Sequence, residues 1–323
     1  MTQLPSKIRI NEEGPREGFQ IEKNHIPTER KIELIDSLSQ TGLQQIQTVS
    51  FVPPKNVPGM ADADDVVNGF TRFPDVEYTA LWLNERGLRR ALNHSKLDIK
   101  GYLSLCASTA FLAKNQKRTP QENLQAARDL LQIYQDHEIS IHRLSLMAAF
   151  GCNFEGDISP STVVKFVRQM TDLLAEHNMS ANHVSLADTM AWATPASIKR
   201  VVSAVQDAFP TLDICLHLHD TRGMGIANAY AGLEMGVALF DACVGGLGGC
   251  PFAAHKGAAG NVCTEDLVFM CDEMGIETGI DLNKIIESAL LAEEIVGHPL
   301  PGSVKTGGSL AILRENIAKA KNA

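Results

Sequence analysis

The segment NHVSLADTMAWATPASIKRVVSAVQDAFPTLDICLHLH, residues 182–219, decides the fold. An apolar run at 182–188 reads as a strand. It is followed by Thr194 and Pro195, a typical N-cap residue and first-turn proline of a helix. The helical pattern that they begin gives way to a second apolar run at 213–219. A strand, a helix and another strand in this order predict a parallel βαβ unit.

The same alternation extends outward through the chain. Further helix starts are predicted at Thr119 and at Ser159, each before a proline, and at Thr28 as an N-cap with Gly42 as the stop. Eight apolar runs are predicted strands: 8–10, 45–51, 77–83, 99–105, 139–147, 182–188, 213–219 and 238–244. This rhythm predicts an α/β fold, a (β/α)8 TIM barrel over residues 1–280, with a doubly wound sheet as the alternative. Residues 281–323 are expected to form a C-terminal helical extension packed on the barrel.

Composition narrows the class of protein. The chain has 323 residues, 44% of them hydrophobic, and a net charge of −9, which argues against nucleic-acid binding. It contains no apolar run long enough for a membrane span, and its first residues show no targeting pattern, so we expect a cytoplasmic protein. Seven cysteines without a CxxC pair suit a reducing compartment. A small-molecule substrate is expected, and a homo-oligomer is possible.

Two histidines suggest a metal site. His217 and His219 alternate in a predicted strand, so both side chains should point to the same face. A surface strand with two solvated histidines is the simpler interpretation, but other polar residues also follow predicted strands, among them Glu17 and Asp188. The carboxyl ends of barrel strands carry the chemistry. With Asn261, the set Glu17, His217 and His219 would suit Mg²⁺ or Mn²⁺, and Zn²⁺ is ranked second.

A glycine-rich loop at 245–261 follows the last predicted strand. A long surface loop is the plain interpretation of this composition. The functional one is a lid that closes over substrate and delivers the Cys250 thiol to the reacting carbon. The other cysteines lie in apolar contexts and are expected in the core.

These motifs together resemble a known family. GPREGFQIEKN (14–24), SFVPPKNVPGM (50–60), SLADT (185–189), HLHDTRGMGIAN (217–228) and GGLGGCPFA (245–253) resemble 3-hydroxy-3-methylglutaryl-CoA lyase, a metal-dependent lyase of the (β/α)8 barrel type related to isopropylmalate synthase. The resemblance covers about residues 8–280. It implies cleavage of a carbon–carbon bond in a 3-hydroxyacyl-CoA, which yields a shorter acyl-CoA and a keto acid.

The resemblance also implies roles for particular residues. Position 17, His217, His219 and Asn261 correspond to the family's metal ligands, and Arg16 to the arginine that stabilises the enolate. Cys250 corresponds to the lid cysteine of proton transfer. Asp188 lies in the active-site shell, and the general base stays open between His217 and Asp188.

Three departures bear on the substrate. Glu17 stands where the family usually has aspartate, Gln47 where it has glutamate, and Arg222 where it commonly has tyrosine. One negative charge lost and one positive charge gained suggest a different acyl group, such as citramalyl-CoA or methylmalyl-CoA.

The residues that would bind coenzyme A are less clearly indicated by the sequence than the metal ligands. Lys114, Lys117 and Arg118 follow the fourth predicted strand, and Lys256 lies in the glycine loop; these cations are candidates for the nucleotide phosphates, or simply solvated. Two other functions remain open. A condensing acyltransferase of the isopropylmalate synthase type would use related metal chemistry to form a carbon–carbon bond instead of breaking one. A non-catalytic binding barrel would explain Glu17 and Gln47 as losses.

Overall fold

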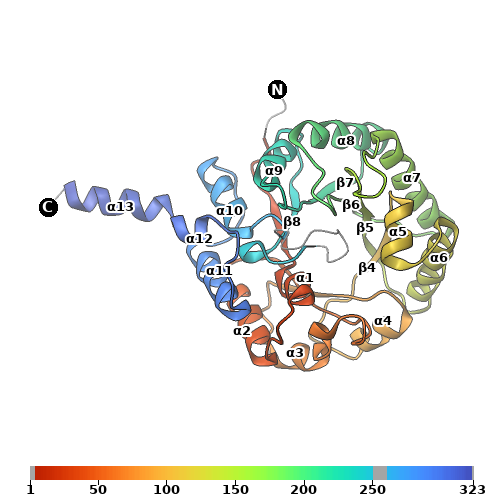
Figure 1. The fold of residues 1–323 in the computed structure, drawn as a ribbon, viewed down its shortest axis with the longest axis horizontal. Helices are drawn as coiled ribbons and strands as arrows, with labels where there is room; N and C mark the ends of the chain where they lie inside the picture. The colour runs from red at the N-terminus through yellow and green to blue at the C-terminus, as the bar shows by residue number, and fades with distance from the viewer. Residues whose placement is uncertain (1–3, 250–259, 322–323) are drawn as a thin grey trace.

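In the computed structural model, which describes residues 4–249 and 260–321, eight parallel strands form one sheet that curls into a barrel, with helices outside it (Figure 1). The predicted (β/α)8 fold is confirmed. The strands are β1 (Arg9–Glu12), β2 (Gln45–Ser50), β3 (Glu77–Leu81), β4 (Gly101–Cys106), β5 (Ile141–Met147), β6 (His183–Ala187), β7 (Asp213–His217) and β8 (Leu239–Ala242). Each overlaps one predicted apolar run.

The strand order explains how the sheet closes. It runs β3-β2-β1-β8-β7-β6-β5-β4, so the first and last strands are neighbours, with Asn11 paired to Asp241. Within the described residues β3 and β4 share no ladder. Side chains link the two strands instead: the indole Nε1 of Trp82, next to β3, donates a 2.9 Å hydrogen bond to the hydroxyl of Tyr134, which in turn donates to the backbone carbonyl of Tyr102 in β4 at 3.3 Å.

The helices follow the strands in turn. They are α1 (Gly14–Ile21), α2 (Thr28–Leu38), α3 (Ala63–Gly69), α4 (Glu85–Leu92), α5 (Thr109–Gln116), α6 (Pro120–Asp136), α7 (Pro160–Glu176), α8 (Pro195–Ala208), α9 (Gly225–Glu234), α10 (Thr264–Glu273), α11 (Leu282–Val296), α12 (Val304–Gly307) and α13 (Leu310–Lys321), with short 3₁₀ turns at η1 (Pro58–Met60) and η2 (Val244–Gly246). None of these helices is long and apolar enough to cross a membrane.

Local chemistry accounts for most helix starts. Thr119 and Thr194 each form a capping box, and Ser159 caps α7, as their positions before proline predict. The prediction for Thr28 was wrong: it is the first residue of α2, and its hydroxyl bonds Asp62 instead of the helix backbone. The predicted strand at 213–219 also ends early, at His217.

The C-terminal helices differ in how they pack. Helix α11 lies against α2 and buries Ile285, Ala289 and Ala292. Helix α13 buries no residue and extends away from the barrel (Figure 1). Its Arg314 forms a pair of hydrogen bonds, 2.8 and 2.7 Å long, with Glu273 of α10. The division into domains at residues 280 and 281 stays a prediction.

Candidate active site

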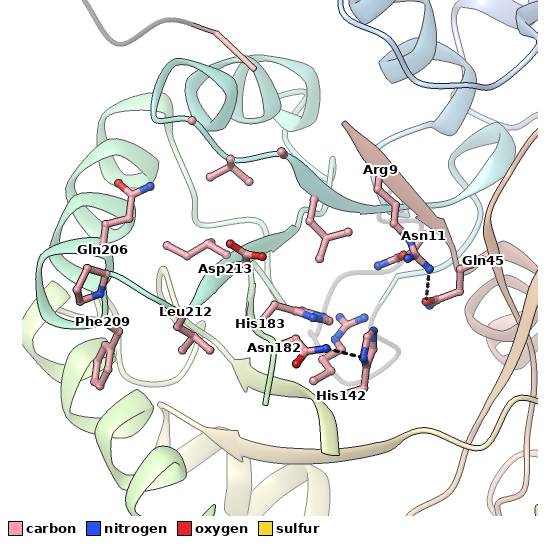
Figure 2. A pocket seen from close by; sticks show the side chains of 17 residues that line it. Arg9, Asn11, Gln45, His142, Asn182, His183, Gln206, Phe209, Leu212 and Asp213 are labelled. Atoms are coloured by element: carbon pink, nitrogen blue, oxygen red, sulfur yellow. Dashed lines mark hydrogen bonds between the residues drawn. The ribbon is translucent and has the colours of Figure 1, made fainter. Parts of the chain in front are cut away.

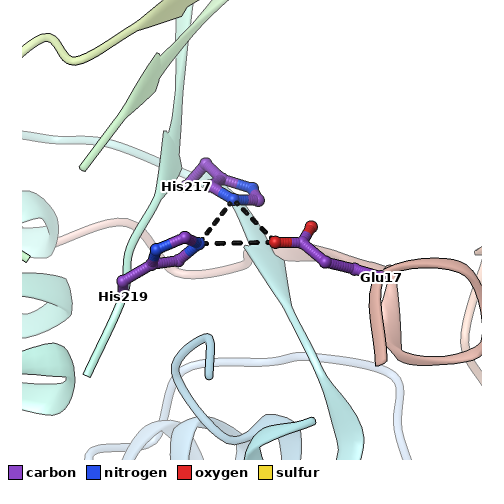
Figure 3. Close-up of side chains that lie close together, drawn as sticks. All are labelled: Glu17, His217 and His219. Atoms are coloured by element: carbon purple, nitrogen blue, oxygen red, sulfur yellow. Dashed lines mark hydrogen bonds and ion pairs between the residues drawn. The ribbon is translucent and has the colours of Figure 1, made fainter. Parts of the chain in front are cut away.

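Three buried side chains meet at the carboxyl end of the barrel strands (Figure 3). The Nε2 atoms of His217 and His219 lie 3.2 Å apart, so the alternation of the two histidines does place them on one face. The Glu17 Oε1 atom lies 3.4 Å from His219 Nε2 and 3.8 Å from His217 Nε2. Glu17 comes from α1, the helix that begins directly after β1.

Hydrogen bonds on the far side of each ring fix how the histidines face the centre. His219 Nδ1 lies 2.9 Å from the carbonyl of Thr189, and His217 Nδ1 lies 3.2 Å from a carboxylate oxygen of Asp241. Because both partners are acceptors, each Nδ1 carries a proton, so that in the neutral imidazole it is Nε2 that presents a lone pair to the centre. This arrangement is typical of histidines that bind metals.

Asn261 supplies a fourth candidate ligand. It forms an isolated antiparallel bridge with His219, and its Nδ2 donates to the Cys243 sulfur at 3.0 Å. Its Oδ1 atom is buried and has no hydrogen-bond partner among the described residues. A buried amide oxygen without a partner is costly unless something binds it. Two imidazoles, a carboxylate and this amide oxygen therefore fit a divalent cation.

Neighbouring charges determine the protonation states of Glu17 and His217. Burial alone would raise the pKa of Glu17, but Arg16 and the two histidines hold that pKa well below its usual range. Burial would likewise lower the pKa of His217, but the carboxylates of Glu17, Asp241 and Glu13 outweigh it and raise that pKa to about 9. In the absence of a cation the site thus pairs an ionised carboxylate with a protonated imidazole.

A second group of charged residues lies beneath this triad and was missed in the sequence. Glu13, His217 and Asp241 also gather their ligand atoms closely. The guanidinium of Arg143 already lies among them, with NH1 3.2 Å from Glu13 and 3.1 Å from Asp241. We therefore interpret this group as a buried ion-pair layer, not as a second metal site. The available signal was a charged residue, Arg143 or Asp241, inside an apolar strand pattern.

Arg16 lies beside the triad, as the sequence predicted. Its NH2 is 3.1 Å from the Glu17 carboxylate and 2.5 Å from that of Glu13, and its Nε donates to the side-chain oxygen of Gln47. Gln47 therefore contacts Arg16 directly. Two carboxylates and an amide hold the guanidinium at the edge of the site.

Asp188 and Arg222 come from two loops that meet near His219, one after β6 and the other after β7. Asp188 accepts hydrogen bonds from the backbone of Trp192 at 2.7 Å and of Ala193 at 3.0 Å, while its Oδ2 is buried without a partner in the described chain. Burial raises the pKa of Asp188 to about 6 against those bonds. Arg222 donates to the backbone carbonyls of residues 190 and 191 at 2.9 and 2.8 Å, so its charge lies over the loop that follows Asp188.

The base of the glycine-rich loop is tied to the barrel by buried carboxyl groups that the sequence reasoning did not assign. Glu12 accepts hydrogen bonds from Gly14, Val244 and Thr264, at 2.7, 3.0 and 2.6 Å, which joins the ends of β1 and β8 to the start of α10. Burial raises the pKa of Glu12 to about 7.

Gly260 is packed so closely that an added Cβ would lie within 2.6 Å of three carbonyl oxygens of residues 246–248. The two described ends of the loop therefore meet at the site. The predicted lid residues Cys250 and Lys256 lie outside the described residues. The other six cysteines are all buried, as expected for core residues.

The predicted coenzyme A cations lie around the end of α5. Lys114 and Lys117 are exposed and Arg118 is half-buried. The Lys114 ammonium sits 3.9 Å from the centre of the Phe154 ring, a cation–π contact. Lys117 adopts a left-handed backbone conformation that ends the helix. These residues lie at the same rim as the triad because α5 follows the carboxyl end of β4.

Comparison with known proteins assigns the whole barrel to one protein family. Residues 7–291 match the family model described as HMGL-like. The mitochondrial hydroxymethylglutaryl-CoA lyase of Mus musculus is 39% identical over 288 residues, which cover 89% of this chain and 85% of the mouse protein.

Two solved structures are similar in fold and in sequence. The Bacillus subtilis HMG-CoA lyase superposes with a TM-score of 0.84 at 38% identity, covering 93% of this chain and 97% of that one. An HMG-CoA lyase from Acinetobacter baumannii, in complex with coenzyme A and 3-methylmalate, gives a TM-score of 0.83 at 36% identity, covering 96% and 97%.

Proposed function

This chain belongs to the HMGL-like family and is a carbon–carbon lyase of the hydroxymethylglutaryl-CoA lyase type, and on that premise we propose how its site works. The substrate is a 3-hydroxyacyl-CoA, which the enzyme cleaves to a shorter acyl-CoA (acetyl-CoA from the 3-hydroxy-3-methylglutaryl thioester) and a keto acid. The observation that carries the proposal is the convergence of Glu17, His217 and His219 with inward-facing ligand atoms.

Glu17, His217, His219 and Asn261 would hold a divalent cation, Mg²⁺ or Mn²⁺ before Zn²⁺. Two oxygen and two nitrogen donors match the preference of the harder ions, whereas zinc favours a closed tetrahedral set richer in nitrogen and sulfur. When bound, the cation supplies Lewis acidity that lowers the pKa of a coordinated substrate hydroxyl. The carboxylate of Asp241 positions His217 through its Nδ1 proton.

Arg16 stabilises the negative charge that develops on the thioester oxygen as the carbon–carbon bond breaks. A guanidinium keeps its charge at any working pH, and here Glu13 and Gln47 fix its orientation before substrate arrives. Preorganised charge of this kind contributes most when the donors need not move during the reaction.

Asp188 is the better supported of the two candidate bases. Both ring nitrogens of His217 are committed, one to Asp241 and one to the triad centre. Asp188 instead keeps a buried oxygen without a partner among residues that the structure describes, and its raised pKa of about 6 suits proton exchange near neutral pH. We assign to the Cys250 thiol the return of a proton to the enolate carbon.

Coenzyme A would bind along the rim formed by α5. Lys114, Lys117, Arg118 and Lys256 are the cations proposed to meet its phosphates, and the complex of the Acinetobacter relative with coenzyme A supports an acyl-CoA substrate. A charge reversal at Lys117 should weaken the apparent affinity for acyl-CoA. Unchanged affinity would remove this residue from the assignment.

The acyl group is the finer question. Gln47 and Arg222 alter the charge near the substrate, and they support citramalyl-CoA or methylmalyl-CoA as substrates instead of, or besides, 3-hydroxy-3-methylglutaryl-CoA. Purified protein with Mg²⁺ should be offered all three thioesters, with products identified by mass. Cleavage of the methylglutaryl thioester alone would mean that these departures leave the family substrate in place.

Two variants extend that assay. Arg222→Tyr should shift the ranking of the three thioesters, and an unchanged ranking would refute the charge argument. Glu17→Ala should abolish cleavage of all three, because it removes the carboxylate ligand. Release of free coenzyme A thiol would instead favour the condensing reaction, since a lyase keeps the thioester intact. Absence of both divalent-cation binding and turnover would favour the binding barrel.

Compartment and assembly are lesser parts of the proposal. We propose a cytoplasmic location, supported by the six buried cysteine thiols, which suit a reducing compartment. A homo-oligomer is also proposed, because α13 carries the exposed apolar residues Leu313 and Ile317 beyond the barrel. Size measurement in solution would test it.

A further inference from the structure

A cavity of about 460 Å³ opens at the opposite face of the barrel, where the strands begin (Figure 2). Arg9, His183 and Asp213, the first residues of β1, β6 and β7, line it, so it lies at the amino-terminal ends of the strands and away from the triad. Its volume is within the range of small-molecule sites and many times the roughly 30 Å³ of one water molecule.

Three polar atoms of the lining side chains are buried and have no hydrogen-bond partner among residues 4–249 and 260–321: Arg9 Nε, Asn11 Oδ1 and His183 Nε2. Asn11 and His183 are 3% and 6% exposed. Figure 2 shows Arg9 and Asn11 on one side of the pocket and His183 facing them from the other. Buried polar atoms are rarely left unpaired, so three at one cavity indicate a missing partner.

The chemistry of these atoms specifies that partner. Asn11 Nδ2 donates a 3.0 Å hydrogen bond to the Asp241 carboxylate. Because a carboxylate only accepts hydrogen bonds, the atom beside it must be the amide nitrogen, and the other amide atom of Asn11, Oδ1, is an acceptor. The NH2 group of Arg9 donates hydrogen bonds to Glu77 and Gln45, at 2.7 and 3.3 Å, and its Nε–H is a further donor. The ligand therefore offers both an acceptor, for Arg9, and a donor, for Asn11.

Charged groups of both signs lie around the cavity: Arg9 and Lys100 pair with Glu77, and Arg143 pairs with Glu13 and Asp241. Burial is the main cause of the low pKa of His183, about 3; the nearby charges of Arg143 and Arg9 lower it further, and the charge of Asp241 raises it. Burial and Lys100 lower the pKa of His142, and Glu77 opposes them. Asp213 lines the mouth but is exposed, so solvent screens its charge. The unpaired Nε–H of Arg9 belongs to a charged guanidinium, so it favours an anionic acceptor such as a carboxylate over a neutral one.

One part of the wall is apolar, formed by Leu212, Val237 and Leu239, while Gln45, Asn182 and Gln206 line other parts of the cavity. The apolar part offers water no hydrogen bonds but can pack against a hydrocarbon chain. We infer that this cavity binds a small 2-hydroxycarboxylate with a short aliphatic chain, its carboxylate at Arg9, its hydroxyl on Asn11 and its chain on the apolar wall. This site is separate from the proposed catalytic one.

The experiment uses 2-hydroxy-4-methylpentanoate as probe with the Mg²⁺-loaded full chain. Isothermal titration should show saturable binding at a Kd of about 1 mM or tighter. Removing the hydroxyl (4-methylpentanoate) should weaken binding at least about tenfold, because it leaves Asn11 Oδ1 unpaired. Removing the charge (2-hydroxy-4-methylpentanamide) should weaken binding to a similar extent, because a neutral carbonyl replaces the charge-assisted hydrogen bond to Arg9. Absence of saturable binding by the probe, or equal binding of all three compounds, would overturn the inference.

Variants locate the probe. Arg9→Lys removes Nε while keeping the charge, and it should weaken binding by about tenfold or more. His183→Phe removes Nε2, the third unpaired atom of the lining, and should weaken binding as well. Arg72→Lys is the matched control, since Arg72 is an arginine paired to Asp98 on the surface, 2.9 Å away, and it should bind the probe as the wild type does. The probe should also shift the His183 ring signals in ¹H–¹⁵N spectra.

A variant of the catalytic end separates this inference from the proposed function. Glu17→Ala should abolish cleavage and leave probe affinity unchanged. Loss of probe binding in Glu17→Ala, with full binding in Arg9→Lys, would place the hydroxy acid at the metal site and refute a second site, whatever the outcome of the cleavage assays.

Discussion

Asp241→Asn tests whether the buried ion-pair layer controls the site above it. Asp241 is fully buried and accepts hydrogen bonds from Asn11 at 3.0 Å, from Arg143 at 3.1 Å and from His217 at 3.2 Å. Its pKa is lowered by Arg143 and His217 in spite of burial, so it is ionised in the folded protein. The amide keeps the shape and removes the charge.

The expected effects follow from those contacts. Removing one member of a buried ion pair costs roughly 3–5 kcal/mol, and we expect the lower end because Glu13 still contacts Arg143. The variant also loses the carboxylate that holds the Nδ1 proton of His217. Loss of such a partner typically weakens metal binding by roughly 10–100-fold, or about 1.4–2.7 kcal/mol.

Urea unfolding and Mn²⁺ titration measure the two effects separately. Asp213→Asn is the matched control, since Asp213 is an exposed aspartate at the other end of the same strand, β7, and it should change the unfolding free energy by less than about 0.5 kcal/mol. If Asp241→Asn destabilises the fold but binds Mn²⁺ within about twofold of wild type, the positioning argument is wrong.

Three further changes probe particular contacts. Burial raises the pKa of Glu265 from 4.5 to about 8, so the stability it contributes is complete below about pH 4.5 and is lost as pH rises through about 8; Glu265→Gln should flatten the unfolding free energy across that window, and an unchanged profile would contradict it. Thr119→Ala breaks the capping box of α6 and should cost about 1 kcal/mol in thermal or urea unfolding, whereas no change would mean that the cap is not needed. Trp82→Phe removes the hydrogen bond to Tyr134 across the seam of β3 and β4 and leaves a buried hydroxyl short of a donor, so it should cost about 1–2 kcal/mol by urea unfolding; a neutral effect would show that packing alone holds the seam.

Patterns that repeat over a few residues were readable in the sequence. Strands and helices are set by local periodicity and caps, which is why all eight strands and the caps at Thr119, Ser159 and Thr194 were predicted. The convergence of His217 and His219 follows from the two-residue period of a strand. Thr28 failed as a cap because a tertiary partner, Asp62, takes its hydroxyl.

Contacts between residues that are far apart in the sequence could be known only from the tertiary structure. Glu13, Arg143 and Asp241 come from different parts of the chain, and no local pattern shows that the closed barrel brings their charges into one layer beneath His217. The cavity at the other face depends on the same closure, which sets the β1 side chains of Arg9 and Asn11 opposite His183 of β6. The sequence by itself determined the elements and the family of the site. Long-range packing alone determined which buried charges are paired and which polar atoms remain open to a ligand, because pairing depends on distances of a few ångströms that only the closed barrel fixes.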